Sequence, residues 1–377
     1  MKNAAKVIRV LEQAGYEAYI VGGAVRDYLL GKTPHDMDVA SNASPEQVKK
    51  LFSRTVDTGI EHGTVLVLLE GEGIEVTTFR TEGAYSDMRR PDKVEFVQSL
   101  EEDLKRRDFT INAMAMDEQL QVIDPFGGRG DLEKRIIRAV GDPGERFQED
   151  ALRMLRAVRF SGQLDFSVDP GTLAAIQQHA SLISAVAVER LKNELDKILI
   201  NARTKRSMCY LKDSGLTRHL PGGALLEMEW SGYVPQGQAA YGWAYMLYRQ
   251  GAEFSAVRGF KFSNGEKRLV EQALKAARLE KWDAWTFYCF ECKELEIAAY
   301  LSGRSVIPQQ EKEARPIQSK RDLAVNGTDL MQWAGERQGQ WIRQWIESME
   351  HKIVFGQLPN DHEKIKDWFL NEYHRHA

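Results

Sequence analysis

The pattern of apolar residues changes near residue 140, and this change constrains the fold more than any other feature of the chain. Before it, short runs typical of strands alternate with helix-forming segments and turn residues. After it, from "PGERFQEDALRMLRAVRF" (143–160) onward, apolar residues recur at helical spacing and strand patterns nearly vanish. The sequence therefore predicts an α+β head, with a mixed sheet and helices, followed by a long all-α part.

Local start and stop signals mark the elements of the first third. Strands are expected in "EAYIVGG" (17–23), "DMDVAS" (36–41), "TVLVLLEGEGIEVTTFR" (64–80, two strands) and "KVEFV" (93–97). The glycines at 71 and 73 provide the turn of a hairpin in the third segment. A helix over "AVRDYLLG" (24–31) ends at Gly31, and Ser44 is the expected N-cap of a helix with Pro45 at its first position.

Neither a membrane segment nor a cysteine- or histidine-based metal site is indicated. The N-terminal "MKNAAKVIRVLEQAG" has the pattern of an amphipathic helix, and no apolar run reaches the roughly 18 residues of a membrane span. Cys289 and Cys292 form a C-x-x-C pair, but no second pair completes a zinc site. We expect a cytoplasmic protein with no membrane partner.

Positive charge is concentrated in two parts of the helical region. The net charge of the chain is −4, but residues 190–218 carry eight Lys or Arg against three Asp or Glu, and residues 257–278 carry six against two. A solvated helix face is the common explanation of one such patch. Two patches in one chain also suit a partner with a phosphate backbone. Both explanations stay open at this point.

The stretch "IVGGAVRDYLLGKTPHDMDVA" (20–40) combines several features of a phosphate site. Gly22 and Gly23 follow a strand and open a helix, where free backbone N–H groups and the positive helix end attract phosphate. Arg26 lies one turn into that helix and can add a charge-assisted contact to the same phosphates. Together these residues predict a site for a phosphorylated ligand.

Two aspartates one residue apart end this stretch. Asp36 and Asp38 occupy alternate positions of an expected strand, so their side chains share one face. Carboxylates so placed repel one another unless a cation lies between them, and Mg²⁺ takes one or two carboxylates together with phosphate oxygens. A pair of surface aspartates at a loop edge is the alternative. Glu75 is a candidate third carboxylate that would orient or deprotonate an incoming hydroxyl, or it faces solvent.

A ridge of charged residues is expected on the helix "EDALRMLRAVRF" (149–160). Successive i, i+3 positions hold Asp150, Arg153, Arg156 and Arg159. Three arginines in a row repel one another and require an anionic or acceptor-rich partner. The alternative is a solvent-facing ridge with an Asp150–Arg153 ion pair.

These stretches together resemble the nucleotidyltransferase superfamily of DNA polymerase β type, and more narrowly the class II tRNA nucleotidyltransferase (CCA-adding enzyme) and bacterial poly(A) polymerase family. Other motifs that carry the resemblance are "YSDMRRPDKVEF" (85–96), "RRDFTINAMA" (106–115), "DPFGGRGDL" (124–132) and "RDLAVNGTDLM" (321–331). The resemblance implies a polymerase β-like head over 1–138, followed by an elongated helical neck with a base-recognition helix (139–200), a helical body (201–310) and a helical, RNA-binding tail (311–377).

The activity that the resemblance implies is template-independent addition of C, C and A to the 3′ end of tRNA. CTP and ATP would be the substrates, and Mg²⁺ held by the catalytic Asp36 and Asp38 would be the cofactor. Arg107 is assigned to the nucleotide by the resemblance, while Asp108 could instead cap a helix. The expected nucleotide-binding residues are Gly23, Arg26, Arg107, Asp150, Arg153, Arg156 and Arg159.

The pair Asp150 and Arg153 offers a way to choose a base without a template. Cytosine and adenine both present an exocyclic amine beside an unprotonated ring nitrogen, whereas uracil and guanine present a carbonyl beside a ring N–H. Asp150 can accept from the amine while Arg153 donates to the ring nitrogen. The same pair opposes uracil and guanine with mismatched donors and acceptors. The resemblance implies that Arg156 and Arg159 serve the triphosphate or brace Asp150.

Full CCA addition is the expected activity within the family. The chain has no basic C-terminal extension of the poly(A) polymerase kind, and "YSDMRRPDKV" (85–94) keeps a charged loop of the kind that helps the switch from C to A. No later His/Asp cluster indicates an HD phosphohydrolase domain.

Alternatives to full CCA addition stay open. CC-adding and A-adding enzymes and poly(A) polymerases share the catalytic residues. A non-catalytic tRNA-binding protein is opposed by the intact carboxylates, and a small-molecule nucleotidyltransferase by the long helical part. The expected partner is the tRNA acceptor arm, with the protein a monomer or homodimer.

Overall fold

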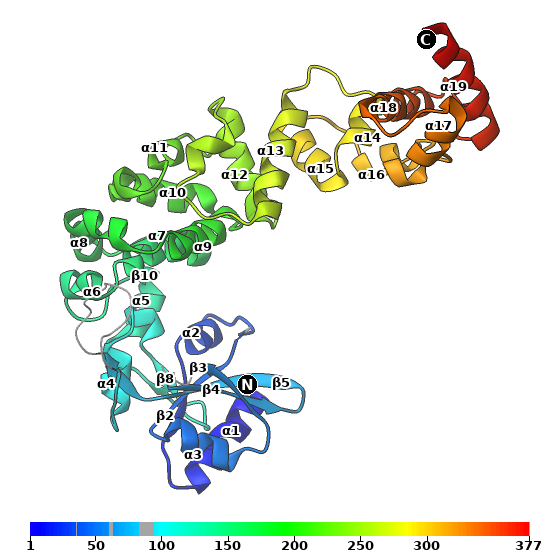
Figure 1. The fold of residues 1–377 in the computed structure, drawn as a ribbon. Coiled ribbons are helices and arrows are strands. Elements are labelled where there is room, and N and C mark those ends of the chain that lie inside the picture. Colours follow the sequence, from blue (N-terminus) through cyan, green and yellow to red (C-terminus); the bar gives the residue numbers. More distant parts are fainter. Residues whose placement is uncertain (35, 60–62, 83–93, 377) are drawn as a thin grey trace. The chain divides into compact units, whose positions relative to one another are not determined.

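The computed structural model describes residues 1–34, 36–59, 63–82 and 94–376. By their contacts they form two compact units, Met1–Ala239 with Val257–Lys261, and Ala240–Ala256 with Phe262–Ala377. Within the described residues, the strands all belong to the first unit and the second unit is helical (Figure 1). The predicted sequence of an α+β head and a helical remainder is confirmed.

The elements have the following bounds. The strands are β1 (Ala18–Val21), β2 (Asp38–Ser41), β3 (Thr55–Gly59), β4 (Thr64–Leu69), β5 (Glu72–Thr78), β6 (Arg80–Glu82), β7 (Val94–Phe96), β8 (Ala115–Met116), β9 (Val122–Ile123), β10 (Ile136–Ile137) and β11 (Ser167–Val168). The helices of the first unit are α1 (Lys2–Gln13), α2 (Gly23–Leu29), α3 (Pro45–Leu51), α4 (Leu100–Lys105), the short 3₁₀ helix η2 (Thr110–Asn112), α5 (Gly128–Lys134), α6 (Pro143–Glu149), α7 (Leu152–Leu164), α8 (Pro170–His179), α9 (Val188–Leu199), α10 (Thr204–Asp213) and α11 (Gly223–Leu226). Those of the second are α12 (Ala239–Arg249), α13 (Asn264–Arg278), α14 (Ala284–Cys289), α15 (Cys292–Ser302), α16 (Pro308–Glu313), α17 (Gly327–Ala334), α18 (Gln340–Val354) and α19 (His362–His376).

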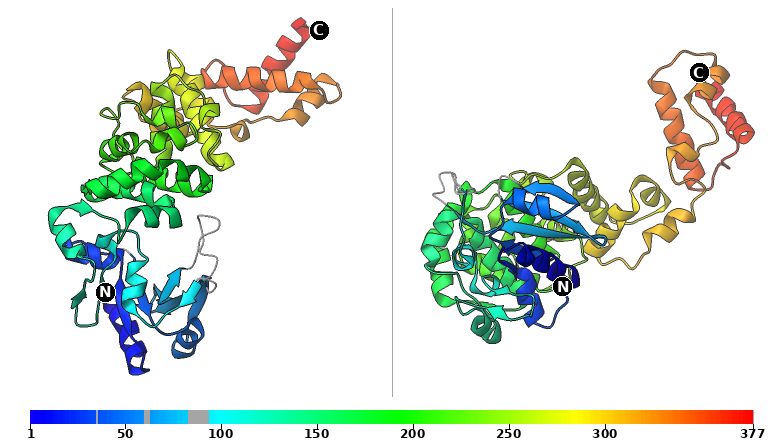
Figure 2. Two further views of the ribbon diagram at one scale, coloured as in Figure 1. Left: turned by 90° about the vertical axis from the view of Figure 1, so that its left-hand side faces the viewer. Right: turned by 90° about the horizontal axis from the view of Figure 1, so that it is seen from below.

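A seven-stranded mixed sheet, in the order β3-β4-β5-β2-β1-β8-β9, forms the centre of the head. β2 pairs in parallel with β5, and the other neighbours are antiparallel. Helix α1 packs on β1, β2 and β5, and α3 packs on β4 and β5 (Figures 1 and 2). The apolar side chains of α1 (Val7, Ile8 and Leu11) are fully buried by this packing, as its amphipathic pattern requires.

The register of β1, β2 and β5 places the end of β1 beside the start of β2 and beside the middle of β5. Val21 of β1 lies opposite Asp38 of β2, and Asp38 lies opposite Glu75 of β5. Val21 also pairs with Ala115 of β8. The Gly22–Gly23 turn that follows β1 therefore lies at the same end of the sheet as Asp38 and Glu75.

Most of the elements predicted for the head are confirmed. Ser44 caps α3 in a capping box with Gln47, and the β4–β5 hairpin turns through Glu70 and Gly71, both with positive φ. The strand predicted in 93–97 corresponds to β7, which pairs only with β6 in a separate two-stranded sheet. β3, β8 and β9 were not predicted, because each lacks a run of alternating apolar residues.

The first helices after the head pack around α7. The short strands β10 and β11 pair in parallel, and the side chain of Asp169 caps α8. α7 packs against α9 and α10. Gly162 of α7 lies against α10, where an added Cβ would be 2.3 Å from Ser207 Oγ, so this crossing depends on glycine.

The second unit contains a separate apolar core near its C-terminal end. Its buried residues come from α17, α18, α19 and the segments that precede and connect them, and partly buried tryptophans pack around them. The chain divides into compact units at Ala239, so the described contacts join the head to the predicted neck and to part of the predicted body. The four-part division stays a prediction. None of the described helices is both long and apolar enough to cross a bilayer.

Candidate active site

The end of the sheet brings together the acidic residues predicted to be catalytic. Asp38 is the first residue of β2, and Glu75 is its direct neighbour on β5. Since paired residues of parallel strands place their side chains on one face, these two carboxylates lie side by side. Asp36 is in a bend two residues before β2, rather than in the strand as predicted, and its charge still acts on Asp38.

The electrostatics of Asp38 are those of a crowded carboxylate. Burial raises its pKa, the neighbouring carboxylates of Glu75 and Asp36 raise it further, and only Arg107 opposes them. Extra negative charge at this position is therefore unfavourable without a positive partner. A cation bound between these carboxylates would relieve the repulsion.

The turn between β1 and α2 requires a glycine. Gly22 has φ +71°, a left-handed conformation that side chains disfavour, and a Cβ there would be 2.8 Å from Arg107 Nη1. Gly23 has no such restriction, since its nearest contact would be 3.5 Å from Arg26 Nη2. The bare backbone of Gly22 thus lets the Arg107 guanidinium lie directly against the turn.

Arg106 and Arg107 share one buried anchor, Asp103 of α4. Asp103 Oδ1 accepts from Arg106 Nη2 at 2.8 Å, and Oδ2 accepts from Arg107 Nη2 at 3.0 Å. Burial alone would raise the pKa of Asp103, but Arg107 and Arg106 outweigh it and hold the pKa below its ordinary value. The acid is therefore held in its charged form between the two guanidinium groups.

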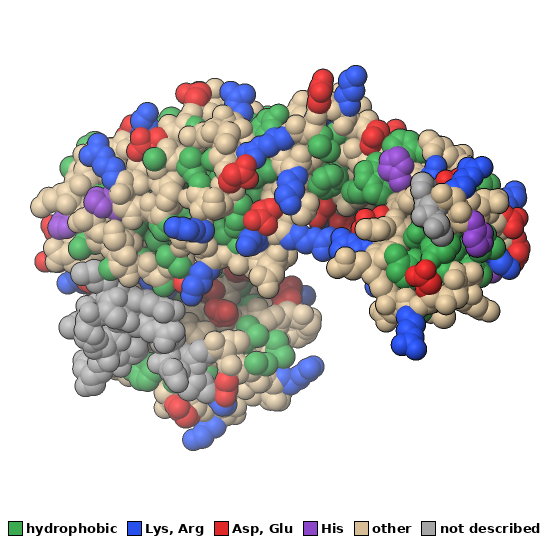
Figure 3. All heavy atoms as spheres, turned by 45° about the horizontal axis from the view of Figure 1, so that its top comes forward, with side chains coloured by type: hydrophobic (Ala, Val, Ile, Leu, Met, Phe, Trp, Pro, Cys, Tyr) green, Lys and Arg blue, Asp and Glu red, His purple; other side chains and the backbone are tan. Residues whose placement is uncertain are grey.

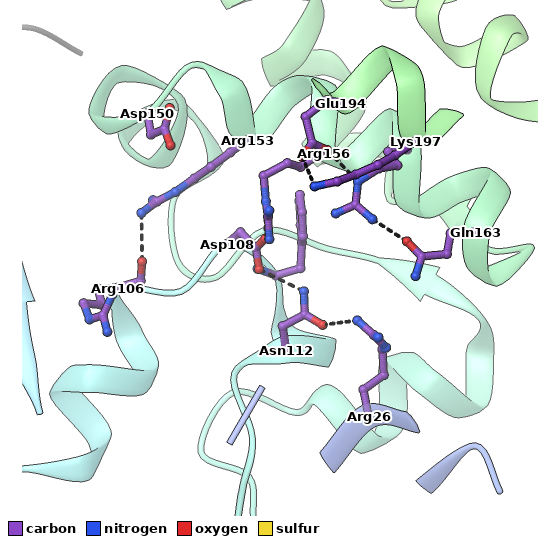
Figure 4. Close-up of polar contacts among 12 residues, drawn as sticks. Arg26, Arg106, Asp108, Asn112, Asp150, Arg153, Arg156, Gln163, Glu194 and Lys197 are labelled. Atoms are coloured by element: carbon purple, nitrogen blue, oxygen red, sulfur yellow. Dashed lines mark hydrogen bonds and ion pairs between the residues drawn. The ribbon is translucent and has the colours of Figure 1, made fainter. Parts of the chain in front are cut away.

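A chain of polar contacts joins the head to α7 (Figure 4). Arg26 Nη1 donates to Asn112 Oδ1 at 2.7 Å, and Asn112 Nδ2 donates to Asp108 Oδ1 at 3.0 Å. Asp108 Oδ2 accepts from Arg156 Nε at 2.9 Å and Nη2 at 2.7 Å. Asp108 therefore binds Arg156 and does not cap a helix, the alternative raised from the sequence.

The Asp108–Arg156 pair has a strongly shifted titration. Burial would raise the pKa of Asp108, yet Arg156 and the Asn112 amide hold the pKa at about 2. The ring of Phe160 lies beneath this pair, with the Arg26 and Arg156 guanidinium carbons 5.4 and 5.5 Å from its centre. An aromatic face of this kind stabilises cations that are withdrawn from water.

The predicted base-reading residues meet at the junction of α6 and α7. Asp150 has an extended backbone and precedes α7, so it does not share a helix face with Arg153 as predicted. Its Oδ1 accepts from Leu152 N at 3.1 Å, and its Oδ2 accepts from Arg190 Nη2 at 2.8 Å. The correction follows from the chain's need to turn between two helices, which the i, i+3 spacing does not reveal.

Arg153 extends from α7 toward the head (Figure 4). Its Nη1 donates to Glu149 Oε2 at 2.7 Å and its Nη2 to the Arg106 backbone oxygen at 2.9 Å. Arg159 instead turns toward α9, where its Nε donates to Glu194, while its Nη1 donates to Gln163 on its own helix α7. Every arginine of the predicted ridge thus has a protein partner, and the ridge is divided between two environments.

A cavity of about 360 Å³ lies at the centre of these groups. Its lining is formed by Gly22, Gly23, Arg26, Asp38, Arg106, Arg107, Asp108, Asn112, Asp150, Leu152, Arg153, Arg156, Phe160 and Arg190. Six arginines face three aspartates there, a surplus of positive charge that suits a polyanion. Arg159 is not part of this lining.

Among the described residues, Arg107 Nε and Arg190 Nη1 are buried without a hydrogen-bond partner. Such orphaned donors are costly unless a ligand accepts from them.

Comparison with known proteins identifies the family. A relative from Levilactobacillus brevis named CCA-adding enzyme is 45% identical over 375 residues, which cover 94% of this chain and 94% of the relative. A CCA-adding enzyme from Geobacillus stearothermophilus is 41% identical over 98% of this chain and 96% of its own length. The chain belongs to the CCA-adding enzyme family.

The structural match to a CCA-adding enzyme extends over the whole chain. The crystal structure of the Bacillus stearothermophilus CCA-adding enzyme in complex with CTP is 37% identical, with a TM-score of 0.89 over 100% of this chain and 98% of that one. A model of the poly(A) polymerase head domain matches residues 18–138, one for an RNA and SrmB binding site of polymerase A matches 165–225, and one for tRNA nucleotidyltransferase domain 2 matches 238–369. The match to the head domain of this family includes Asp36, Asp38 and Glu75.

In this CCA-adding family member, much of the positive charge of the two basic patches (190–218 and 257–278) is paired with carboxylates. Six of the eight cations in 190–218 form ion pairs: Arg190–Asp150, Lys192–Asp196, Lys197–Glu194, Arg203–Asp165, Lys205–Glu229 and Arg206–Asp165. In 257–278, carboxylates outside the patch pair with Lys261, Arg268 and Arg278. On the face drawn in Figure 3, blue and red side chains accordingly lie interspersed.

Several residues around the site were not predicted from the sequence, among them Arg190, Asn112 and Asp103. Arg190 contacts Asp150 from 40 positions away, and Asn112 joins Arg26 to Asp108, so only the fold reveals them. Asp103 could have been predicted from its place four residues before Arg107, a spacing at which side chains meet along a helix and the turn that follows it. The charged loop expected to govern the switch from C to A, residues 85–94, lies almost wholly outside the described residues.

Proposed function

We propose that the chain adds C, C and A to the 3′ end of tRNA from CTP and ATP, without a nucleic-acid template. The observation that carries this proposal is the cavity beside Asp38, which joins a Gly-Gly turn, six arginines and two orphaned donors in a member of the CCA-adding enzyme family. A nucleoside triphosphate supplies the negative charge and the acceptors that such a cavity requires.

The triphosphate is placed between the turn and the arginines. Backbone N–H groups at the start of α2 and the guanidinium groups of Arg26 and Arg107 converge on the cavity. Arg156 also lines the cavity, oriented by Asp108. Because these groups are fixed by protein contacts before the ligand arrives, little ordering is needed when it binds. They favour the charge of the phosphates and of the pyrophosphate that leaves.

Asp36 and Asp38 are the residues that would hold Mg²⁺, with Glu75 beside them. Within the described part of the chain, no group of three or more acidic, histidine or cysteine side chains is arranged as a complete metal site. Mg²⁺ fits this donor set, because it is commonly held by one or two carboxylates and completed by substrate phosphates and water. When bound, the ion supplies charge neutralisation at the reacting phosphate and lowers the pKa of the attacking hydroxyl.

The base is selected by Asp150 and Arg153. A carboxylate has about four lone-pair sites, so Asp150 can accept the amine of cytosine or adenine while keeping its contacts to Leu152 N and Arg190. Arg153 donates to the ring nitrogen. The contact of Arg153 with the Arg106 carbonyl fixes the reading residues to the head, so the base and the phosphates are positioned by one compact unit.

Transfer RNA is the acceptor, held through its acceptor arm by the helical part of the chain. This proposal is supported by the match of residues 165–225 to a model of an RNA-binding site and of residues 238–369 to a model of a tRNA nucleotidyltransferase domain. Cations without an ion pair among the described residues, such as Lys212 and Lys275, are candidates for phosphate contacts. The protein acts in the cytoplasm as a monomer or homodimer.

Product sequencing tests the activity directly. A tRNA that ends before CCA is incubated with CTP alone, ATP alone, or both, and the new 3′ end is read. Full CCA addition gives CC with CTP and CCA with both nucleotides. CC with both nucleotides identifies a CC-adding enzyme, and a run of A identifies a poly(A) polymerase. If the folded protein extends the tRNA with none of these nucleotide mixtures, the proposal is overturned.

A further inference from the structure

One buried carboxylate lies behind the cavity without taking part in its lining. Asp103, near the end of α4, is 0% exposed. Its neighbour Leu104 belongs to an apolar cluster with Val21, Phe79 and Ala115. Because burying a charge is costly unless it is well paired, the position of an acid here requires an explanation.

Asp103 contacts the side chains of two consecutive arginines, and its Oδ1 also accepts from the backbone N–H of Arg80 at 3.4 Å. Oδ1 accepts from Arg106 at 3.1 Å (Nε) and 2.8 Å (Nη2), and Oδ2 accepts from Arg107 Nη2 at 3.0 Å. Two adjacent guanidinium groups repel each other. A single carboxylate that takes one on each oxygen fixes the direction of both.

Both arginines, held in place by Asp103, contact groups of the candidate active site. Arg107 lies against Gly22, acts on the charge of Asp38, and has a buried Nε without a partner among the described residues. Arg106 lines the same cavity, and its carbonyl accepts from Arg153. Asp103 is thus connected through Arg107 to the part of the cavity beside Asp38, and through Arg106 to Arg153.

We infer that Asp103 is a positioning residue, which holds Arg107 and Arg106 in the orientation that binds the triphosphate. The inference rests on the proposed function, because it requires a nucleoside triphosphate in the cavity. Asp103 touches no substrate in this view and acts through the two guanidinium groups.

The direction in which triphosphate affinity changes when Asp103 loses its charge distinguishes this positioning role from a purely electrostatic effect. Removing a negative charge near a polyanion site favours anion binding on electrostatic grounds alone. Releasing Arg107 from its anchor weakens binding of the triphosphate instead, because the guanidinium must then be ordered by the ligand. The two explanations therefore predict opposite changes in affinity.

The test compares Asp103→Asn with Glu102→Gln, an exposed neighbour on the same helix. Both changes remove one negative charge and keep the side-chain shape. We expect Asp103→Asn to weaken binding of CTP to the full-length protein about tenfold, with KM for CTP raised more than kcat is lowered. Glu102→Gln should leave both unchanged or slightly tighten binding. Unchanged or tighter CTP binding by folded Asp103→Asn overturns the inference.

Two further measurements guard against general damage. In an Arg107→Met background, Asp103→Asn should add little to the loss of CTP affinity, as expected for two residues that act as one unit. Binding of CMP should fall less than binding of CTP. Equal losses for CMP and CTP, or fully additive losses with Arg107→Met, would show that Asp103 only maintains the fold. Extension of tRNA by the wild-type protein is scored separately, so failure of the proposed function is distinguishable.

Discussion

At the scale of single residues, the candidate active site places carboxylates that repel one another close to arginines that partly neutralise them. Asp38 is crowded by Glu75 and Asp36, with Arg107 as the opposing charge. In the same cavity lining, Arg156 is neutralised by Asp108. The carboxylates around Asp38 therefore lack positive charge, while the cavity lining as a whole holds more arginines than aspartates. A metal ion with a triphosphate supplies positive charge to the carboxylates and negative charge to the arginines.

Loss of a metal-binding carboxylate should abolish chemistry while sparing binding of tRNA. We expect Asp38→Ala to reduce nucleotide addition by at least about a hundredfold, because one anchor of the metal is lost. Affinity for tRNA should stay near that of the wild type. The matched control is Asp57→Ala, an exposed aspartate on the edge strand β3 of the same sheet. Activity of Asp38→Ala within tenfold of wild type would rule out the metal assignment.

Base choice should depend on Asp150 as an acceptor. Asp150→Asn replaces one acceptor oxygen by a donor, which meets the amine of cytosine or adenine with like polarity. We expect incorporation of U or G to gain about 1–3 kcal/mol relative to C, measured as the ratio of kcat/KM for the four nucleotides. The same ratio for Arg153→Ala provides the second arm. Equal slowing of all four nucleotides by both variants would place base reading elsewhere.

Helix α7 is the element that connects the parts of the site. It carries Arg153, which contacts the backbone of Arg106, and Arg156, which contacts Asp108. Its far end is fixed by Arg159, which pairs with Glu194 of α9. Displacement of α7 would therefore move the base-reading and phosphate-binding groups together.

The contact of α7 with the head should weaken in acid. The pKa of Asp108 is lowered from 3.8 to about 2 in the folded protein, so its contribution is fully present above pH 4 and is lost as the pH falls toward 2. A shift of this size corresponds to about 2 kcal/mol. The free energy of unfolding, measured in urea from pH 2.5 to 6 for wild type and Asp108→Asn, should differ more at pH 5 than at pH 2.5. A difference that stays constant with pH would contradict this account.

Elements with strong local signals could be predicted from the sequence, and those without could not. The capping box of Ser44 and the turn at Gly71 determine α3 and the β4–β5 hairpin within a few residues. β8 and β9 are two residues long and exist because β1 offers an edge on which β8 can pair. A strand that depends on its neighbour for stability carries little signal of its own.

At the scale of the whole molecule, many cations of the two basic patches form ion pairs, some of them with acids distant in the sequence. Arg203 and Arg206 both pair with Asp165, which lies outside the sequence window in which the surplus was counted. A count of charges along the sequence cannot detect such pairing, nor could it connect Arg190 to Asp150. The residue types of the site were predictable from motifs, whereas their partners depend on the fold.

Binding of tRNA should depend on the cations of α10 that remain available. Lys205 has only a 3.7 Å contact with an exposed glutamate, and Lys212 has no ion pair among the described residues. We expect Lys205→Ala with Lys212→Ala to weaken tRNA binding and to reduce the slope of log K against log salt by about 1 to 2. Base choice should not change. Lys49→Ala with Lys50→Ala, on α3 of the head, is the control. An unaltered slope would assign α10 to the solvated surface.

The contrast between Gly22 and Gly23 sets how much variation the phosphate turn can tolerate. Any of the other amino acids at position 22 would bring a Cβ to 2.8 Å from Arg107 Nη1 and force a left-handed φ, whereas alanine at position 23 meets only ordinary contacts. In a saturation library selected for folded protein alone, position 22 should therefore return almost only the wild-type codons, while its neighbour returns alanine and serine as well. Two adjacent glycines that look equivalent in the sequence are thus under very different selection.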